Sequence, residues 1–159
     1  AVRYPRGRGR EPPFDPSSLD PDHREGRSAT REKDIVLLAF GSMLAPALEA
    51  GQCLQATVVN MRFVKPLDEA LILEMALTHD LVVTVEENAL MGGAGSAVGE
   101  CLAHHQVSVP LLHLGLPDHF IDQGEVCQLW QDCGLDAPGL ERQIRARLQS
   151  LTHPNRALG

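Results

Sequence analysis

Four short, almost continuously apolar runs recur about every 25 residues along the chain, and a segment with helical spacing follows each of them. The runs are residues 34–40, 56–64, 81–85 and 109–115. Strands that are apolar along their whole length are typical of parallel sheets, because helices cover both faces of such a sheet. The alternation therefore predicts an α/β fold, a three-layer, doubly wound, mainly parallel sheet with right-handed crossovers.

The segments between and after these runs are expected to be helical. The expected helices span residues 43–55, 66–79, 96–105, 125–133 and 138–151. Ser42 is placed to act as the N-cap of the first helix, and Pro66 suits the first turn of the second. Ligands and partners of doubly wound sheets approach the loops that follow the strands. Those loops are residues 41–42, 63–66, 86–95 and 115–124, and they contain most of the unusual residues.

The charge distribution divides the chain near Lys33. Residues 1–33 carry eight Lys or Arg, six Asp or Glu and five prolines, and their composition predicts a disordered linker over residues 8–33. Residues 34–152 are predicted to form the compact domain, with residues 153–159 as a tail. The net charge of −7 argues against a general nucleic-acid binder, which would need a basic face. Residues 1–6 contain no apolar signal core, and the sequence has no run of the roughly 18 apolar residues that a membrane span needs, so we expect a cytoplasmic protein.

The cysteines and histidines show no spacing typical of a zinc site. None of the four cysteines forms a Cys-x-x-Cys pair, and Cys53 and Cys101 lie on predicted helices among apolar residues. We therefore expect them to be buried, reduced thiols. His104 and His105 lie at the end of a predicted helix. A metal site there would need acidic residues nearby, and no metal site is assigned.

The run MGGAGS at residues 91–96 follows a strand and opens a helix, which is the setting of a phosphate-binding loop. The spacing of Gly93, Gly95 and Gly99 differs by one residue from the dinucleotide fingerprint, and the loop lacks the lysine of a P-loop. A simpler interpretation is that the glycines allow a positive φ and let the helix pack closely on the sheet. Binding of a nucleotide or another anion by a freestanding module stays open as an alternative.

Two further groups of polar residues lie in the same loops. Glu86 and Glu87 are adjacent on a strand, so their carboxylates should point to opposite faces and form a poor acid–base pair. We expect one of them to accept hydrogen bonds from loop amides or to face a partner. Asp118-His119 could belong to a hydrolase triad only if a serine such as Ser42 or Ser96 converged on it, and the chain has no G-x-S-x-G motif. No catalytic residue is assigned.

Five motifs occur together in one order, and as a set they resemble the C-terminal end of the 1-deoxy-D-xylulose-5-phosphate synthase family, within the transketolase superfamily. The motifs span residues 1–7, 63–68, 83–88, 92–96 and 115–118. The runs RYPRG at residues 3–7 and FVKPLD at residues 63–68 favour this family. The beta subunit of the 2-oxo-acid dehydrogenases, which has a related C-terminal domain, is the alternative.

The resemblance implies a homodimeric transferase that uses thiamine diphosphate and Mg²⁺ to condense pyruvate with glyceraldehyde 3-phosphate. This reaction is the first step of the non-mevalonate isoprenoid pathway and also feeds thiamine synthesis. The family's third domain, residues 34–152 here, is chiefly structural and packs with the cofactor-binding domains of the same protein. This chain alone is therefore expected to bind no cofactor and to be inactive. Residues 1–7 match the end of the preceding pyrimidine-binding domain, where Arg6 falls on the arginine that binds the substrate phosphate.

Overall fold

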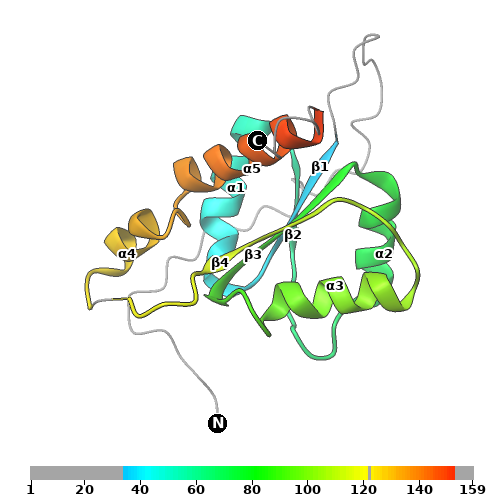
Figure 1. Ribbon diagram of the computed structural model, residues 1–159, viewed down its shortest axis with the longest axis horizontal. Coiled ribbons are helices and arrows are strands. Elements are labelled where there is room, and N and C mark those ends of the chain that lie inside the picture. The colour runs from blue at the N-terminus through cyan, green and yellow to red at the C-terminus, as the bar shows by residue number, and fades with distance from the viewer. Residues whose placement is uncertain (1–33, 122, 153–159) are drawn as a thin grey trace, which may run out of the picture. The chain divides into compact units, whose positions relative to one another are not determined.

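The computed structural model describes residues 34–121 and 123–152 (Figure 1). Three of the predictions above lie outside these described residues: the end of a preceding domain at residues 1–7, the linker at residues 8–33 and the tail at residues 153–159. Arg6 lies outside them as well. None of the helices in the described ranges is both long and apolar enough to cross a membrane.

A four-stranded parallel sheet forms the centre of the domain, with the strands in the order β2-β1-β3-β4. The strands are β1 (Ile35–Ala39), β2 (Thr57–Asn60), β3 (Leu81–Ala89) and β4 (Leu111–Leu116). The central strands β1 and β3 pair with Leu37 opposite Val83, and all of β1 and the first six residues of β3 are buried. The apolar runs at residues 34–40 and 81–85 thus form the covered strands that they predicted, whereas β2 and β4 at the edges are only partly buried.

Helices cover both faces of the sheet, which confirms the three-layer, doubly wound architecture (Figure 1). The helical segments are the 3₁₀ turn η2 (Gly41–Met43), α1 (Leu44–Leu54), α2 (Glu69–Thr78), α3 (Ala94–His104), α4 (Val126–Asp132) and α5 (Ala137–Thr152). On one face, α1 and α5 enclose a core that contains Leu37 and Val83. On the other face, α2 and α3 enclose a second core that contains Val36 and Val82. Successive strand residues supply the two cores because side chains alternate across a sheet.

The structure corrects two predicted helix starts. Ser42 is not an N-cap, because it lies inside η2 and its hydroxyl donates a hydrogen bond to Glu87 instead. Pro66 precedes α2, which begins at Glu69 because the Asp68 carboxylate accepts a hydrogen bond of 3.1 Å from the Leu71 amide. An N-cap carboxylate of this kind accepts a hydrogen bond from one of the amides that the first turn of a helix leaves free.

The edge strand and the cysteines also differ from expectation. β2 ends at Asn60 and Met61 is still buried, but residues 62–66, which include Phe63 and Val64, are exposed. All four cysteines are free, and Cys101 is buried, but Cys53 and Cys127 are exposed. The prediction of burial was therefore wrong for Cys53, which lies on the side of α1 that faces away from the sheet. Apolar neighbours in the sequence do not indicate which side of a helix is covered.

Candidate functional site at the carboxyl edge of the sheet

The buried carboxylate of Glu86 binds the N-terminus of α3. Glu86 is only 3% exposed and lies on β3, where the pairing with β4 shifts register between Val85 and Ala89. One carboxylate oxygen accepts a hydrogen bond of 2.7 Å from the Ala94 amide, and the other accepts one of 2.8 Å from the Gly95 amide. A negative charge is favourable at the positive end of a helix. The anion held by these amides is therefore part of the protein itself, which confirms that one of the two adjacent glutamates accepts hydrogen bonds from loop amides.

The glycines of this loop are required by space and by backbone conformation. Gly92 has a φ of +75°. A Cβ atom on Gly93 would lie 2.6 Å from a carboxylate oxygen of Glu86, and one on Gly95 would lie 2.6 Å from Nδ1 of His113. The simpler interpretation of the glycine-rich run is confirmed, because the glycines let α3 approach β3 and β4 closely. A nucleotide phosphate would have to displace Glu86 to reach the amides of Ala94 and Gly95.

Two polar side chains on the neighbouring strands β3 and β4 form a hydrogen bond close to the start of α3. Thr84 Oγ1 and His113 Nδ1 lie 2.8 Å apart. Burial lowers the pKa of His113, and the nearby charge of Glu86 opposes this effect. A neutral imidazole suits this position, because the ring lies close to the backbone of Gly95 at the start of α3, and the start of a helix disfavours a positive charge. Thr84 and Glu86 are buried and His113 is partly buried, so the three form a polar cluster between the sheet and α3.

Glu87 points away from this cluster and joins three elements at the carboxyl edge. Its carboxylate accepts hydrogen bonds from the Ser42 hydroxyl and, at 3.1 Å, from Nε1 of Trp130. Ser42 follows β1 and Trp130 lies on α4, so Glu87 connects them to β3. The chain leaves β1 and β3 toward opposite faces of the sheet, and the crevice at such a switch point is where ligands bind in this class of fold. In this protein, the hydrogen bonds of Glu87 to Ser42 and Trp130 link the segments that follow β1 and β3 at this point.

The structure does not bring the residues of a hydrolase triad together. The Ser42 hydroxyl is bound to Glu87, as described above. The Ser96 hydroxyl donates to the Leu90 carbonyl at 3.2 Å and accepts from the Gly92 amide at 3.0 Å, so it holds the glycine-rich loop. Asp118 and His119 are exposed on the loop after β4. Both candidate serines are thus occupied by other contacts.

Large apolar side chains are exposed at the same edge of the sheet. We call this set the apolar rim and define it as Phe63, Val64, Met91 and Phe120. Met91 is 74% exposed and Phe120 is 90% exposed. They follow β2, β3 and β4, whose carboxyl ends lie at one edge because the strands are parallel. Apolar side chains exposed on several loops of one edge make this edge a candidate surface for contact with another protein.

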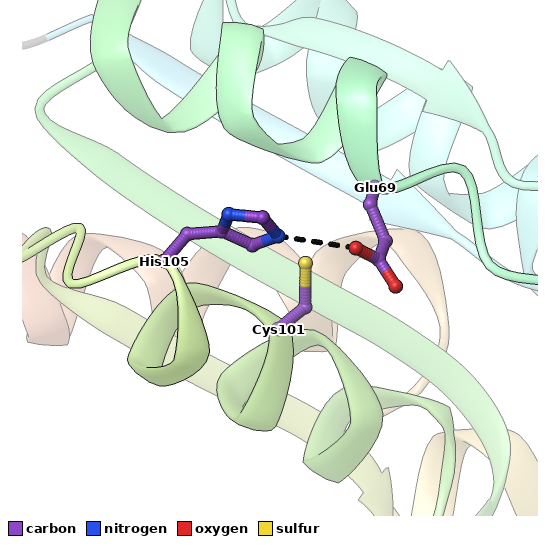
Figure 2. A group of neighbouring side chains, drawn as sticks. All are labelled: Glu69, Cys101 and His105. Atoms are coloured by element: carbon purple, nitrogen blue, oxygen red, sulfur yellow. Dashed lines mark hydrogen bonds and ion pairs between the residues drawn. The ribbon is translucent and has the colours of Figure 1, made fainter.

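A second group of chemically active side chains lies away from this edge, where the sequence analysis assigned nothing. His105 Nε2 lies 3.1 Å from Oε2 of Glu69, and Cys101 lies beside both (Figure 2). Burial raises the pKa of the Cys101 thiol, and the charge of Glu69 raises it further. The acid that the sequence analysis required near His105 is present, but on α2. The four-residue spacing of Cys101 and His105 was the one local sign of this group.

Comparisons with known proteins give the family of this chain and several of its relatives. The family described as the C-terminal domain of transketolase matches residues 25–140. The 1-deoxy-D-xylulose-5-phosphate synthase of Pseudomonas aeruginosa is 52% identical over 148 residues, and the match covers 93% of this chain and 24% of that protein. The corresponding synthase of Nitrosomonas eutropha is 54% identical over 154 residues, again covering 93% of this chain and 24% of the relative. This chain thus spans 24% of the length of these curated relatives.

A solved structure shows the same fold. A split-gene transketolase, described as an inactive beta4 tetramer, superposes with a TM-score of 0.65 and is 36% identical in sequence. The superposition covers 75% of this chain and 39% of the transketolase chain.

Proposed function

This chain belongs to the transketolase C-terminal domain family, and from that premise we propose that it is the C-terminal domain of a 1-deoxy-D-xylulose-5-phosphate synthase. The observation that carries the proposal is the 50–54% identity to such synthases over 93–95% of the chain. The proposed whole protein is a cytoplasmic homodimer that depends on thiamine diphosphate and Mg²⁺. It transfers the two-carbon unit of pyruvate, after loss of CO₂, to glyceraldehyde 3-phosphate.

Within this protein we propose a structural role for residues 34–152. Two observations support this role. The carboxylates at the carboxyl edge are occupied by protein donors, since Glu86 binds backbone amides of α3 and Glu87 binds Ser42 and Trp130. The apolar rim beside them is exposed and suits contact with the cofactor-binding domains or the second subunit.

The described residues do not fit the diphosphate of the cofactor. The amides at the start of α3 are the natural anion-binding groups of this fold, and Glu86 already binds them. The sequence has no Lys or Arg between Lys65 and Arg142 that could neutralise a phosphate near that loop. The same two facts argue against the alternative of a freestanding nucleotide-binding module. We therefore assign the cofactor and Mg²⁺ to the other domains of the proposed protein.

We further propose that residues 1–7 end the pyrimidine-binding domain and that Arg6 binds the phosphate of the aldehyde substrate. The guanidinium group can form two parallel hydrogen bonds to a phosphate, which a lysine cannot. The support for this assignment is the run RYPRG at residues 3–7 and its resemblance to the synthase family.

The test is an assay of the complete gene product that contains this chain. With pyruvate, glyceraldehyde 3-phosphate, thiamine diphosphate and Mg²⁺, we expect formation of 1-deoxy-D-xylulose 5-phosphate and loss of CO₂. The 159-residue chain alone is the matched control and should give no product. A complete protein that fails to form this product refutes the proposal, and one that instead needs a second, separately encoded subunit supports the 2-oxo-acid dehydrogenase alternative.

A further inference from the structure

Three side chains that can bind a metal meet where the beginning of α2 lies beside the end of α3. Cys101 lies on α3, and His105, four residues further on, is the C-cap residue directly after it, so both side chains lie on one side of the helix end; Glu69 is the first residue of α2. Their ligand atoms all lie within 4.8 Å of one another. Figure 2 shows the three side chains pointing toward one another from the two helices. We propose that Glu69, Cys101 and His105 form a binding site for a divalent transition-metal ion such as Zn²⁺.

The donor atoms select the class of ion. A thiolate sulfur, an imidazole nitrogen and a carboxylate oxygen are the three ligand types of zinc sites, and three protein ligands leave a fourth position for water. Mg²⁺ and Ca²⁺ prefer oxygen ligands, and only one of the three residues, Glu69, supplies oxygen atoms. The site therefore differs from the Mg²⁺ site that the proposed reaction requires. The inference of a zinc-type site does not rest on the proposed function.

The geometry needs only small side-chain rotations to accept the ion. Ligand distances of about 2.0–2.3 Å in a tetrahedral site place the ligand atoms roughly 3.3–3.8 Å apart. The pair His105 Nε2 and Glu69 Oε2, at 3.1 Å, is already close to that separation. Cys101 is buried, whereas the side chains of His105 and Glu69 are 36% and 59% exposed. The two exposed ligands can adjust, and they leave the ion a path from solvent.

Binding would join the first turn of α2 to the end of α3 on one face of the sheet. The two helices pack through the core that contains Ile72 and Val98, and the cluster lies at the margin of this core. A metal bound by residues from both helices adds a link that the unfolded chain lacks, so it should stabilise the folded state.

Titration of the reduced 159-residue chain with Co²⁺ tests the site directly, because Co²⁺ replaces Zn²⁺ and absorbs light. We expect one equivalent of Co²⁺ to give a thiolate-to-cobalt charge-transfer band in the near ultraviolet and the visible bands of tetrahedral Co²⁺. Added Zn²⁺ should then abolish these bands. Absence of the charge-transfer band overturns the proposal.

Matched variants show which residues bind the ion. Cys101→Ser should lose the charge-transfer band, and Glu69→Gln and His105→Gln should each weaken Co²⁺ binding at least about tenfold, since even outer-shell partners of a metal contribute about 10–100-fold. Glu69 and His105 are partly exposed, so their variants should fold even if the buried Cys101 variant does not. The controls His104→Gln and Cys53→Ser should bind Co²⁺ as the wild type does. Retention of the band in Cys101→Ser, or its loss in Cys53→Ser, overturns the assignment.

A stability measurement gives an independent readout. Saturating Zn²⁺ should raise the Tm of the wild type and of His104→Gln, and the rise should disappear in His105→Gln. Equal rises in His104→Gln and His105→Gln would place the bound zinc elsewhere and overturn the proposal.

Discussion

Replacing Glu86 by glutamine tests whether this carboxylate holds the start of α3. The variant keeps the size of the side chain but removes its charge and one of its two acceptor oxygens. One of the buried amides, Ala94 or Gly95, then faces an NH₂ group instead of the oxygen that now lies within 2.8 Å. The lost charge-assisted hydrogen bond corresponds to about 1.5–3 kcal/mol. The lost interaction with the helix dipole adds about 0.3–1 kcal/mol.

We therefore expect Glu86→Gln to lower the free energy of unfolding by about 2–4 kcal/mol. The assay is urea denaturation of the whole chain followed by far-ultraviolet circular dichroism. Glu100→Gln is the matched control, because Glu100 is exposed on the same helix and its replacement should change stability by less than about 0.5 kcal/mol. A loss in Glu86→Gln no larger than that of the control would refute the assigned role of Glu86.

Three further predictions concern packing, pH and the substrate. Gly95→Ala should destabilise the chain by at least about 1–3 kcal/mol, because its Cβ would lie 2.5 Å from Thr84 Oγ1. Gly99→Ala should be neutral or stabilising by up to about 1 kcal/mol, since the atom nearest to its Cβ would be 3.6 Å away. Thermal denaturation of the two variants compares their stabilities. Burial lowers the pKa of His113 in the folded state, so the unfolded chain binds the proton more readily, and stability should fall as the pH decreases below about 6.5. Urea denaturation at a series of pH values should show a weaker dependence in His113→Gln, and an unchanged dependence contradicts this explanation. In the complete enzyme, Arg6→Ala should raise the KM for glyceraldehyde 3-phosphate about 30- to 150-fold, which corresponds to roughly 2–3 kcal/mol, with little change in the KM for pyruvate. An unchanged aldehyde KM in steady-state kinetics removes the Arg6 assignment.

The fold was predictable because its central strands are covered on both faces. Runs such as residues 34–40 and 81–85 must be apolar throughout in this position, so they are visible in the sequence without any knowledge of their partners. The edge strand was less predictable, because only residues 57–60 of the expected run 56–64 pair with β1, and the apolar residues Phe63 and Val64 lie beyond the ladder. Apolar character alone does not separate a strand from an exposed contact surface.

The polar contacts were predictable only in part, because they depend on the tertiary structure. The opposite directions of Glu86 and Glu87 follow from strand geometry, but which of them binds the α3 amides depends on the face that α3 covers. The hydrogen bond between Ser42 and Glu87 joins residues that are 45 positions apart. Because the Ser42 hydroxyl makes this bond, it does not cap the helix as predicted. Likewise, Glu69 and His105 are 36 positions apart, so no local pattern could place the acid beside the histidine.

Hydroxyl-radical footprinting of the apolar rim tests most directly whether the carboxyl edge of the sheet serves protein contact. The side chains of Met91 and Phe120 should react freely in this chain alone and become strongly protected in the complete protein. Leu77 is as exposed as Met91 but lies on α2, and it is the internal reference. Protection of Met91 and Phe120 relative to Leu77 is the result we predict. Equal reactivity of both rim residues in this chain alone and in the complete protein would contradict the account.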